Sequence, residues 1–252
     1  MDAFNPAKAA FGFAFLTVVG MSIDSAYAQG GGGAWGGGKL YVPAILSTTG
    51  SACESAPGGK CANEIKPGKH PVIVFLHGCG GLKQPRPFLD LGAIVVAPNS
   101  FAGGVACKPD AKYMAQFVKA RHADVSYAVN QVKAAAWADQ NKILLAGFSN
   151  GGQTAATYPG GEFKARVIVA WTCNNPRVPE QNGVRGSGPI LAVLGTADEF
   201  YKKIGISGNC AEAVKGRGEG SQSILIQGGS HEILDHATTR EAVAKFIPAV
   251  IR

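Results

Sequence analysis

The sequence predicts an α/β fold in which a mostly parallel, doubly wound sheet carries helices on both faces. Short runs rich in Val and Ile recur along the chain and are bounded by Gly, Pro or Asn, as in strands that are buried on both faces. Stretches of helical periodicity lie between several of these runs, and this alternation favours a parallel sheet over an all-β sandwich. The 252 residues, 46% of them hydrophobic and 16% charged, suffice for one large domain with a buried core.

Each expected strand is a short, mostly apolar run. The runs are 40–46, 72–76, 93–97, 143–146, 167–170, 190–194 and 223–226. Helical periodicity appears at 121–139, 151–158 and 238–251. The stretch 202–220 contains several glycines and charges, and we expect a surface loop or short helix there rather than a lid. The pattern shows neither an internal repeat nor a second domain.

Residues 1–28 have the pattern of an export signal. Lys8 precedes an apolar run at 9–21, and Ala26-Tyr27-Ala28 supplies the small residues that flank a cleavage point before Gln29. The apolar run is 13 residues long, which is too short to cross a bilayer comfortably. The sequence therefore predicts a secreted or periplasmic protein, and a retained N-terminal anchor is the alternative.

Residues 29–38 are mostly glycine and are expected to form a flexible linker. This leaves 39–252 as the folded domain. No segment of that domain is apolar for long enough to be a membrane helix, so we expect no stable membrane insertion.

The chain is basic, with a formal net charge of +7. Removing residues 1–28 takes away Lys8, Asp2 and Asp24 and leaves 23 basic and 15 acidic residues, or +8. The Lys and Arg residues are scattered and no nucleic-acid-binding motif is present. We therefore interpret the charge as a contribution to solubility and expect no nucleic-acid partner.

Six cysteines lie beyond the signal, at Cys53, Cys61, Cys79, Cys107, Cys173 and Cys210. An even number of cysteines in an exported chain indicates disulfides, although sequence alone permits several connectivities. The least demanding pairing joins Cys53 to Cys61 in a local loop, and then Cys79 to Cys107 and Cys173 to Cys210. No C-x-x-C or Cys/His ligand spacing is present, so we expect no metal site.

The motif Gly147-Phe148-Ser149-Asn150-Gly151 carries the most specific chemical signal. It directly follows the expected strand 143–146 and precedes the expected helix 151–158. This is the G-x-S-x-G nucleophile elbow in its strand–turn–helix context, where the glycines let strand and helix approach closely. The helix N-terminus beneath Ser149 also stabilises negative charge. We therefore predict that Ser149 is a nucleophile.

A serine nucleophile needs a base that is oriented by an acid, and in this architecture they follow in the order Ser, acid, His. His231 comes directly after the expected strand 223–226, whereas His236 lies five residues further on. Asp198 follows the expected strand 190–194 in Gly195-Thr196-Ala197-Asp198. We predict that His231 is the base and Asp198 the acid. Glu199 is the nearest competitor of Asp198, and the other carboxylates after Ser149 are Glu162, Glu180, Glu212, Glu219, Glu232 and Asp235.

An oxyanion hole needs two backbone N–H donors. The residue after the nucleophile, Asn150, supplies one. The expected strand 72–76 runs into His77-Gly78-Cys79-Gly80-Gly81, where Gly78 allows a turn that directs the N–H of Cys79 to the reacting carbonyl. His77 is expected to organise this loop by hydrogen bonding. Cys79 as the nucleophile is the weaker alternative, because Ser149 occupies the elbow.

The ordered set of motifs resembles the dienelactone hydrolase family of α/β-hydrolases. It comprises His77-Gly78-Cys79-Gly80-Gly81, Ala97-Pro98-Asn99-Ser100-Phe101 with Cys107, Arg121 with Asp124, the elbow with Gly152, Gly195-Thr196-Ala197-Asp198 and Gly229-Ser230-His231. The resemblance covers roughly residues 70–235. It implies an α/β-hydrolase fold without a cap domain and activity on carboxylic esters or lactones.

One position departs from that family, because true dienelactone hydrolases carry cysteine where this chain has Ser149. The departure favours general ester hydrolysis over lactone specificity. The chain is also similar to cutinase-like polyester hydrolases, which have a Trp after the strand that follows the elbow. Trp171 stands at that place, so we expect it to contact substrate together with Gly80, and the alternative for Trp171 is a buried core aromatic.

These features together predict an exported serine carboxylic-ester hydrolase that works through an acyl-enzyme, needs no cofactor and is a monomer. Its substrate is a small or polymeric ester. A lactone hydrolase, a cutinase-like polyester hydrolase and a peptidase of the same fold are alternative enzymes. An inactive binding protein of the same fold is the non-enzyme alternative.

Overall fold

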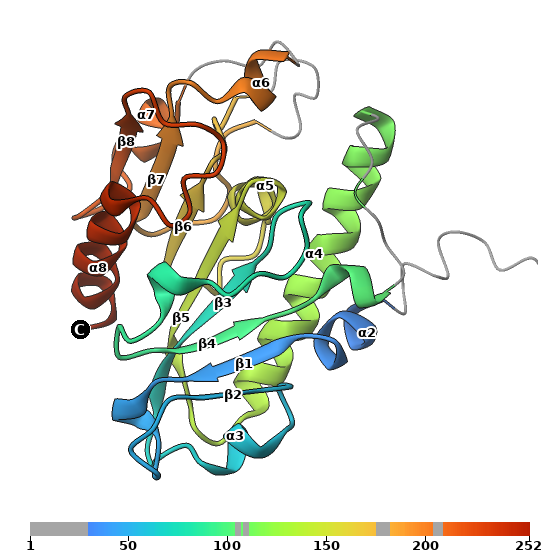
Figure 1. Cartoon of the computed structure of the whole chain (residues 1–252), viewed down its shortest axis with the longest axis vertical. Helices are drawn as coiled ribbons and strands as arrows, with labels where there is room; N and C mark the ends of the chain where they lie inside the picture. The colour runs from blue at the N-terminus through green and yellow to red at the C-terminus, as the bar shows by residue number, and fades with distance from the viewer. Residues whose placement is uncertain (1–29, 104–106, 108–110, 175–181, 204–208) are drawn as a thin grey trace, which may run out of the picture.

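The computed structural model describes residues 30–103, 107, 111–174, 182–203 and 209–252. Within these residues one sheet is formed by β1 (Lys39–Val42), β2 (Cys53–Ser55), β3 (His70–Leu76), β4 (Ile94–Ala97), β5 (Ala138–Phe148), β6 (Ala165–Val169), β7 (Ile190–Gly195) and β8 (Gln222–Ile226). The strand order is β2-β1-β4-β3-β5-β6-β7-β8 (Figure 1). Strands β3 to β8 are parallel, whereas β1 pairs antiparallel with β2 and β4.

Helices cover both faces of this sheet. The long helix α4 (Ala111–Ala134) and the last helix α8 (Ala237–Ile251) lie on opposite sides of it (Figure 1). Successive residues of a strand point to opposite faces, so Val72 and Val74 join the core beneath α4 while Ile73 and Phe75 join the core beneath α8. Burial on both faces explains why the strands read as continuous apolar runs and confirms the doubly wound architecture.

Shorter helical segments connect or flank the strands. They are α2 (Gly30–Gly36), α3 (Lys60–Asn63), α5 (Asn150–Thr157), α6 (Glu199–Lys203), α7 (Ala211–Val214) and the 3₁₀ turns η1 (Ala44–Leu46), η2 (Arg86–Phe88) and η3 (Ser100–Gly103). The stretch 202–220 contains the end of α6 and all of α7, and its residues 204–208 lie outside the described part of the chain.

Three expected elements differ most from their expected bounds. The strand expected at 40–46 ends at Val42, because Pro43 lacks the N–H that would continue the pairing, and a 3₁₀ turn follows. The helix expected at 121–139 is α4, which begins at Ala111 and ends at Ala134. The polar residues 139–142 belong instead to β5, which is longer than its apolar part alone indicated.

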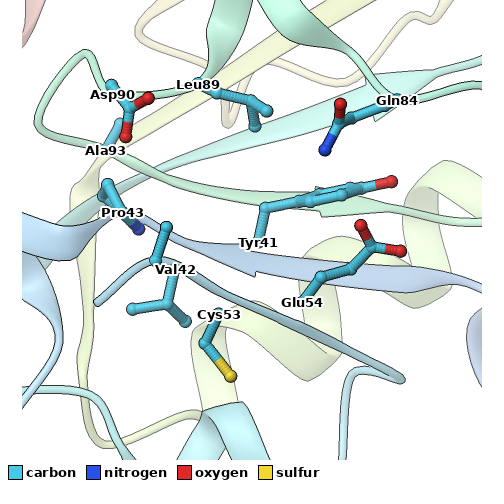
Figure 2. A pocket seen from close by; sticks show the side chains of 10 residues that line it. Tyr41, Val42, Pro43, Cys53, Glu54, Gln84, Leu89, Asp90 and Ala93 are labelled. Atoms are coloured by element: carbon cyan, nitrogen blue, oxygen red, sulfur yellow. The ribbon is translucent and has the colours of Figure 1, made fainter. Parts of the chain in front are cut away.

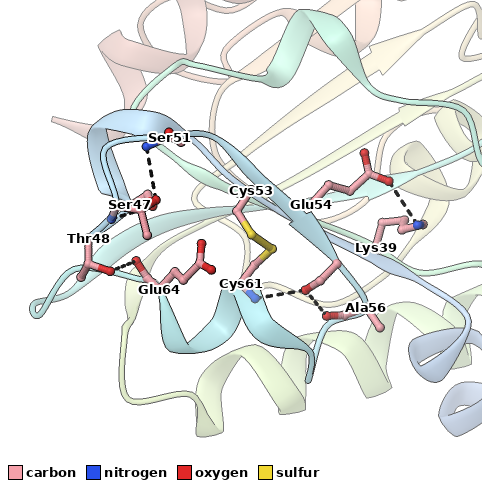
Figure 3. The surroundings of a disulfide bond; sticks show 11 residues. Lys39, Ser47, Thr48, Ser51, Cys53, Glu54, Ala56, Cys61 and Glu64 are labelled. Carbon is pink, nitrogen blue, oxygen red and sulfur yellow. Dashed lines mark hydrogen bonds and ion pairs between the residues drawn. A yellow bond between two sulfur atoms is a disulfide. The ribbon is translucent and has the colours of Figure 1, made fainter.

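Strand β2 was not predicted, since its three residues form no apolar run. It pairs with β1 through Val42 and Cys53, and Lys39 on β1 forms an ion pair with Glu54 at 3.1 Å (Figure 3). The disulfide Cys53–Cys61 joins this edge strand to α3, in which Cys61 is the buried residue. The disulfides Cys79–Cys107 and Cys173–Cys210 are also formed, which confirms the predicted pairing of all six cysteines.

The prediction of a flexible glycine linker is wrong for Gly30–Gly36, which forms α2 and packs against α4 and η3. Ala34 is fully buried, and its carbonyl accepts a hydrogen bond from the backbone N–H of Asn99 at 2.8 Å. A Cβ on Gly31 would lie 2.6 Å from Cβ of Tyr127 in α4. The glycines thus permit a close approach between backbones, which outweighs their low helix propensity. The expected signal at 1–28 lies outside the described residues.

None of the described helices is both long and apolar enough to cross a membrane. No group of three or more His, Cys, Asp or Glu side chains in the described ranges is arranged to hold a metal ion.

Candidate active site

Ser149 occupies a strained turn between β5 and α5. Its backbone angles are φ 56° and ψ −122°, a conformation that non-glycine residues rarely adopt. A Cβ on Gly147 would lie 2.1 Å from the carbonyl oxygen of Gly151, and one on Gly151 would lie 2.0 Å from that of Leu76. Both contacts are with backbone, so the glycines of the elbow are required for strand and helix to meet there.

The structure brings Ser149, His231 and Asp198 together in one hydrogen-bonded row. Nε2 of His231 lies 2.8 Å from Oγ of Ser149, and Nδ1 lies 2.7 Å from Oδ2 of Asp198. The three residues follow β5, β8 and β7, at the carboxyl ends of parallel strands where α/β proteins place their sites. This is the geometry of a nucleophile, a base and an orienting acid.

Asp198 is held on both of its oxygens. Oδ1 accepts hydrogen bonds from the backbone N–H groups of Phe200 at 3.0 Å and Tyr201 at 3.3 Å, in the first turn of α6, and Oδ2 faces His231. The side chain is 4% exposed, whereas that of the competitor Glu199 is 71% exposed and lies 4.0 Å from Lys202. The structure therefore places Asp198, not Glu199, beside the histidine.

His231 lies on a loop that is tightly joined to the loop of Asp198. The backbone N–H of Ala197 donates to the carbonyl of Gly229 at 2.9 Å, and a Cβ on Gly195 would lie only 2.2 Å from the same oxygen. The alternative His236 is exposed and accepts a hydrogen bond from the backbone of Thr238 at the start of α8. It does not reach Ser149 in this arrangement.

Three aromatic rings surround the imidazole of His231. The ring centroids of Phe148, Phe200 and Tyr201 lie 5.5, 5.2 and 5.4 Å from it. The hydroxyl of Tyr201 donates to the carbonyl of Ala170 at 2.5 Å. Burial, reinforced by the charge of Asp198, raises the pKa of Tyr201 well above its usual value, so the phenol stays protonated. Sequence reasoning missed Phe200 and Tyr201, although they lie only two and three residues after the predicted acid Asp198.

The two predicted oxyanion segments lie against the nucleophile. A Cβ on Gly78 would meet Cβ of Ser149 at 3.1 Å and Cδ1 of Phe148 at 3.0 Å, so the loop backbone passes directly beside the elbow. The next residue, Cys79, is linked by its disulfide to Cys107. Asn150 opens α5 and is 4% exposed. The backbones of Cys79 and Asn150 are thus placed on two segments that converge at Ser149.

His77 organises the loop and is not a candidate base. Its Nδ1 lies 2.7 Å from the carbonyl oxygen of Gly78, and its Nε2 accepts from the backbone N–H of Ser100 at 3.1 Å. Burial, together with the charge of Arg121, lowers the pKa of His77 to about 3, against a weaker opposing effect of the Gly78 carbonyl. A neutral imidazole with its proton on Nδ1 satisfies both hydrogen bonds, in agreement with the predicted role.

The dienelactone hydrolase family profile matches residues 59–233, well over half of the chain. The chain belongs to the dienelactone hydrolase family. The matched region contains all three residues of the hydrogen-bonded row and both segments that are predicted to form the oxyanion hole. A search among curated proteins found no match. Membership of this family makes the protein a carboxylic-ester hydrolase, as the sequence predicted.

Several esterases of known structure share this fold at low sequence identity. The hyperthermophilic esterase from the archaeon Pyrobaculum calidifontis superposes with a TM-score of 0.50 and 17% identity, covering 74% of this chain and 78% of that chain. Est1E from Butyrivibrio proteoclasticus superposes with a TM-score of 0.51 and 15% identity, covering 74% of this chain and 90% of that chain. The thermophilic carboxylesterase EstE1 from a metagenomic library superposes with a TM-score of 0.51 and 15% identity, covering 74% of this chain and 82% of that chain. These likenesses confirm the α/β-hydrolase fold.

In this member of the family, a cavity of about 190 Å³ opens beside the elbow. Gly78, Gly80, Phe148 and Leu234 contribute to its lining, so Gly80, for which substrate contact is predicted, faces a cavity next to the elbow. Trp171 does not line it and is 3% exposed, with its ring packed edge-on against Tyr201 at 5.5 Å. This position fits the alternative of a core aromatic and does not support direct substrate contact.

A second cavity, of about 180 Å³, lies beside β1 and β2 (Figure 2). Tyr41 extends between Glu54 and Gln84 in its wall. Burial, with the charge of Glu54, raises the pKa of Tyr41 to about 12. Gln84 lines both this cavity and the cavity beside the elbow.

Proposed function

We propose that the protein is an exported esterase that cleaves its substrates through an acyl-enzyme on Ser149. The observation that carries the proposal is the hydrogen-bonded row in which His231 lies 2.8 Å from Oγ of Ser149 and 2.7 Å from Asp198. A serine hydroxyl is a poor nucleophile unless a positioned base removes its proton as it attacks. The row supplies that base and fixes its orientation.

In the first half of the reaction, Oγ of Ser149 attacks the ester carbonyl carbon and its proton passes to Nε2 of His231. The tetrahedral intermediate collapses when the bond to the leaving oxygen breaks, and His231 returns the proton to the departing alcohol. Water then attacks the acyl-enzyme and gives its proton to His231. Ser149 leaves with that proton, and the carboxylic acid is released.

Asp198 keeps the proton of neutral His231 on Nδ1, so that Nε2 is free to accept one from Ser149. It also stabilises the imidazolium that forms when the proton arrives. The backbone N–H groups of Cys79 and Asn150 hold the developing oxyanion, and loss of one such donor typically costs about 3 kcal/mol of transition-state stabilisation. Phe200 is 46% exposed beside His231 and offers an apolar surface to the substrate.

The test is hydrolysis of p-nitrophenyl acetate, butyrate and octanoate by the wild type, Ser149→Ala and the control Ser187→Ala, whose side chain is exposed. We expect kcat/KM to fall by about 10⁴-fold or more in Ser149→Ala and to remain unchanged in the control. An initial burst of p-nitrophenol would report the acyl-enzyme. Wild-type rates in Ser149→Ala would refute the role of Ser149, and a wild type without activity on any ester would favour the binding protein.

Export is supported by the signal pattern at 1–28 and by three disulfides, which persist in oxidising compartments. Expression of the full chain in a bacterial host tests it by N-terminal sequencing of the periplasmic and culture fractions. We expect a mature chain that begins at Gln29. An uncleaved chain confined to the cytoplasm would contradict the proposal.

A further inference from the structure

A single buried side chain connects the two oxyanion segments. Arg121 in α4 has no exposed surface. Its Nη1 donates to Oδ1 of Asn150 at 2.7 Å, and its Nη2 donates to the backbone carbonyl of His77 at 2.7 Å. Asn150 is the residue after the nucleophile, and His77 begins the loop that carries Cys79. One guanidinium thus holds both backbone segments whose N–H groups are to bind the oxyanion.

The guanidinium is a planar fork whose N–H groups have fixed relative directions. Two short hydrogen bonds from one fork therefore fix the separation of the two segments as well as their individual positions. The Asn150 side chain is held from the other side as well, because its Nδ2 donates to Oε1 of Gln153 at 3.2 Å. The His77 loop is likewise fixed by the hydrogen bond from Ser100.

Arg121 remains a cation despite its burial. Loss of hydration lowers its pKa to about 10, and the charge of Asp124, one turn further along α4, opposes that effect. At neutral pH both of its hydrogen bonds are therefore charge-assisted, which makes them stronger than neutral ones.

We propose that Arg121 is a positioning residue for the oxyanion hole, which sets the distance between the backbone donors of Cys79 and Asn150. This inference rests on the proposed function, because the hole has a purpose only if an oxyanion forms. Replacing Arg121 should weaken the stabilisation of the transition state. Substrate binding in the ground state depends little on the hole, so kcat falls while KM is retained.

The chain contains a closely matched control in Arg166, which is 1% exposed and whose pKa burial also lowers to about 10. Its Nη1 and Nη2 donate to the carbonyls of Ala155 at 2.6 Å and Gly160 at 2.7 Å. Its guanidinium lies 5.5 Å from the ring of Phe163, as that of Arg121 lies 5.5 Å from the ring of Phe117. Ala155 lies in α5 five residues after Asn150, and Gly160 lies beyond that helix, so neither is a residue whose N–H is proposed to bind the oxyanion.

The experiment compares the wild type, Arg121→Met, Arg121→Lys and Arg166→Met as full chains. It measures kcat and KM on p-nitrophenyl butyrate, the thermal midpoint, and the inhibition constant of an alkyl trifluoromethyl ketone. This inhibitor adds to the serine as a tetrahedral oxyanion, so its affinity reports the hole. We expect Arg121→Met to lose about 10²-fold in kcat and in ketone affinity, with KM within about 3-fold of wild type.

Arg121→Lys retains the positive charge and is included in case Arg121→Met fails to fold. One ammonium cannot reproduce a planar fork that donates to two acceptors at once. Arg121→Lys should therefore show most of the loss in kcat and ketone affinity that Arg121→Met shows. Arg166→Met should lower the thermal midpoint about as much as Arg121→Met does, and its kcat and ketone affinity should stay within about 3-fold of the wild-type values. Equal kinetic losses in the Arg121 and Arg166 variants would overturn the proposal, as would unchanged ketone affinity in both Arg121 variants.

A double-mutant cycle adds a readout that a purely structural role would not move. Asn150→Ala removes the side-chain acceptor of Arg121 and leaves the backbone N–H in place. If the two residues act through one contact, Arg121→Met combined with Asn150→Ala should lose less ketone affinity than the product of the two single losses. Strictly multiplicative losses would contradict the proposal. An inactive wild type would instead refute the proposed function itself.

Discussion

Replacing Gly195 with alanine should move Asp198 away from His231. A Cβ at this position would lie 2.2 Å from the carbonyl oxygen of Gly229 and 2.4 Å from that of Ser230. Both contacts are with backbone, so no side chain can rotate away to relieve them. Real Cβ atoms essentially never approach closer than 3.0 Å, and the loops after β7 and β8 must therefore move apart by at least about 0.8 Å.

This displacement acts directly on the Asp198–His231 pair, because Asp198 follows Gly195 by three residues and His231 follows Gly229 by two. If the full movement reaches the pair, its 2.7 Å hydrogen bond lengthens to about 3.5 Å, at which little hydrogen bonding remains. A misplacement of about 1 Å in a catalytic arrangement can cost about 10²-fold in rate. We therefore expect kcat/KM of Gly195→Ala to fall by about 10²-fold.

The assay is p-nitrophenyl butyrate hydrolysis together with thermal unfolding, and Gly161→Ala is the matched control. Gly161 has nothing within 4 Å of its ideal Cβ position, so its replacement should change neither quantity. Gly195→Ala with wild-type kcat/KM and thermal midpoint would refute the inference that these two backbones position the acid and the base.

Three further changes test other parts of the structure. The native pKa of His77, about 3, lies below its unfolded value of 6.5, so the unfolded chain gains a proton first as the pH falls. The free energy of unfolding should therefore decrease below pH 6.5 by about 1.4 kcal/mol per pH unit. Urea unfolding at pH 7 and 4.5 should show a shallower pH dependence in His77→Asn than in the wild type, and an equal pH dependence would contradict this. Removing the Cys173–Cys210 disulfide, whose cysteines are 37 residues apart, should cost about 4 kcal/mol by the chain-entropy relation, and a loss below about 1 kcal/mol in urea unfolding would be incompatible with it. Tyr201→Phe leaves the carbonyl of Ala170 without its hydroxyl donor and also removes the hydrogen bond between this hydroxyl and the Ser149 side chain. It should lower the free energy of unfolding by about 1–3 kcal/mol, and an unchanged free energy in urea unfolding would contradict this.

The parallel part of the sheet was predictable because most of its strands, from β3 to β7, have apolar stretches that are buried on both faces. Runs such as 72–76 and 190–194 contain no polar residue, and each is followed by a short polar segment at the strand's carboxyl end. The same regularity led to the candidate site, because Ser149 and Asp198 follow strands with a buried apolar stretch, and His231 follows the shorter apolar run at the end of the more exposed strand β8. Parallel strands bring those segments to one edge of the sheet.

Other features depend on contacts that local sequence does not encode. Strand β2 has no strand-like composition and is held by pairing with β1 and by the Cys53–Cys61 disulfide. The helix α2 contradicts the low helix propensity of glycine, and its support comes from packing on α4. Arg121 contacts residues 29 and 44 positions away in sequence, so its link between the oxyanion segments emerges only from the folded chain.

The most direct test of the central claim is covalent labelling of the nucleophile. Diethyl p-nitrophenyl phosphate transfers its phosphoryl group to an activated serine and releases p-nitrophenol, so the labelled residue can be identified by peptide mass spectrometry. We predict one diethylphosphoryl group per chain, located on Ser149, with activity lost in proportion to labelling and no label in Ser149→Ala. Stoichiometric labelling of a different residue, or full inhibition with Ser149 unmodified, would contradict the account.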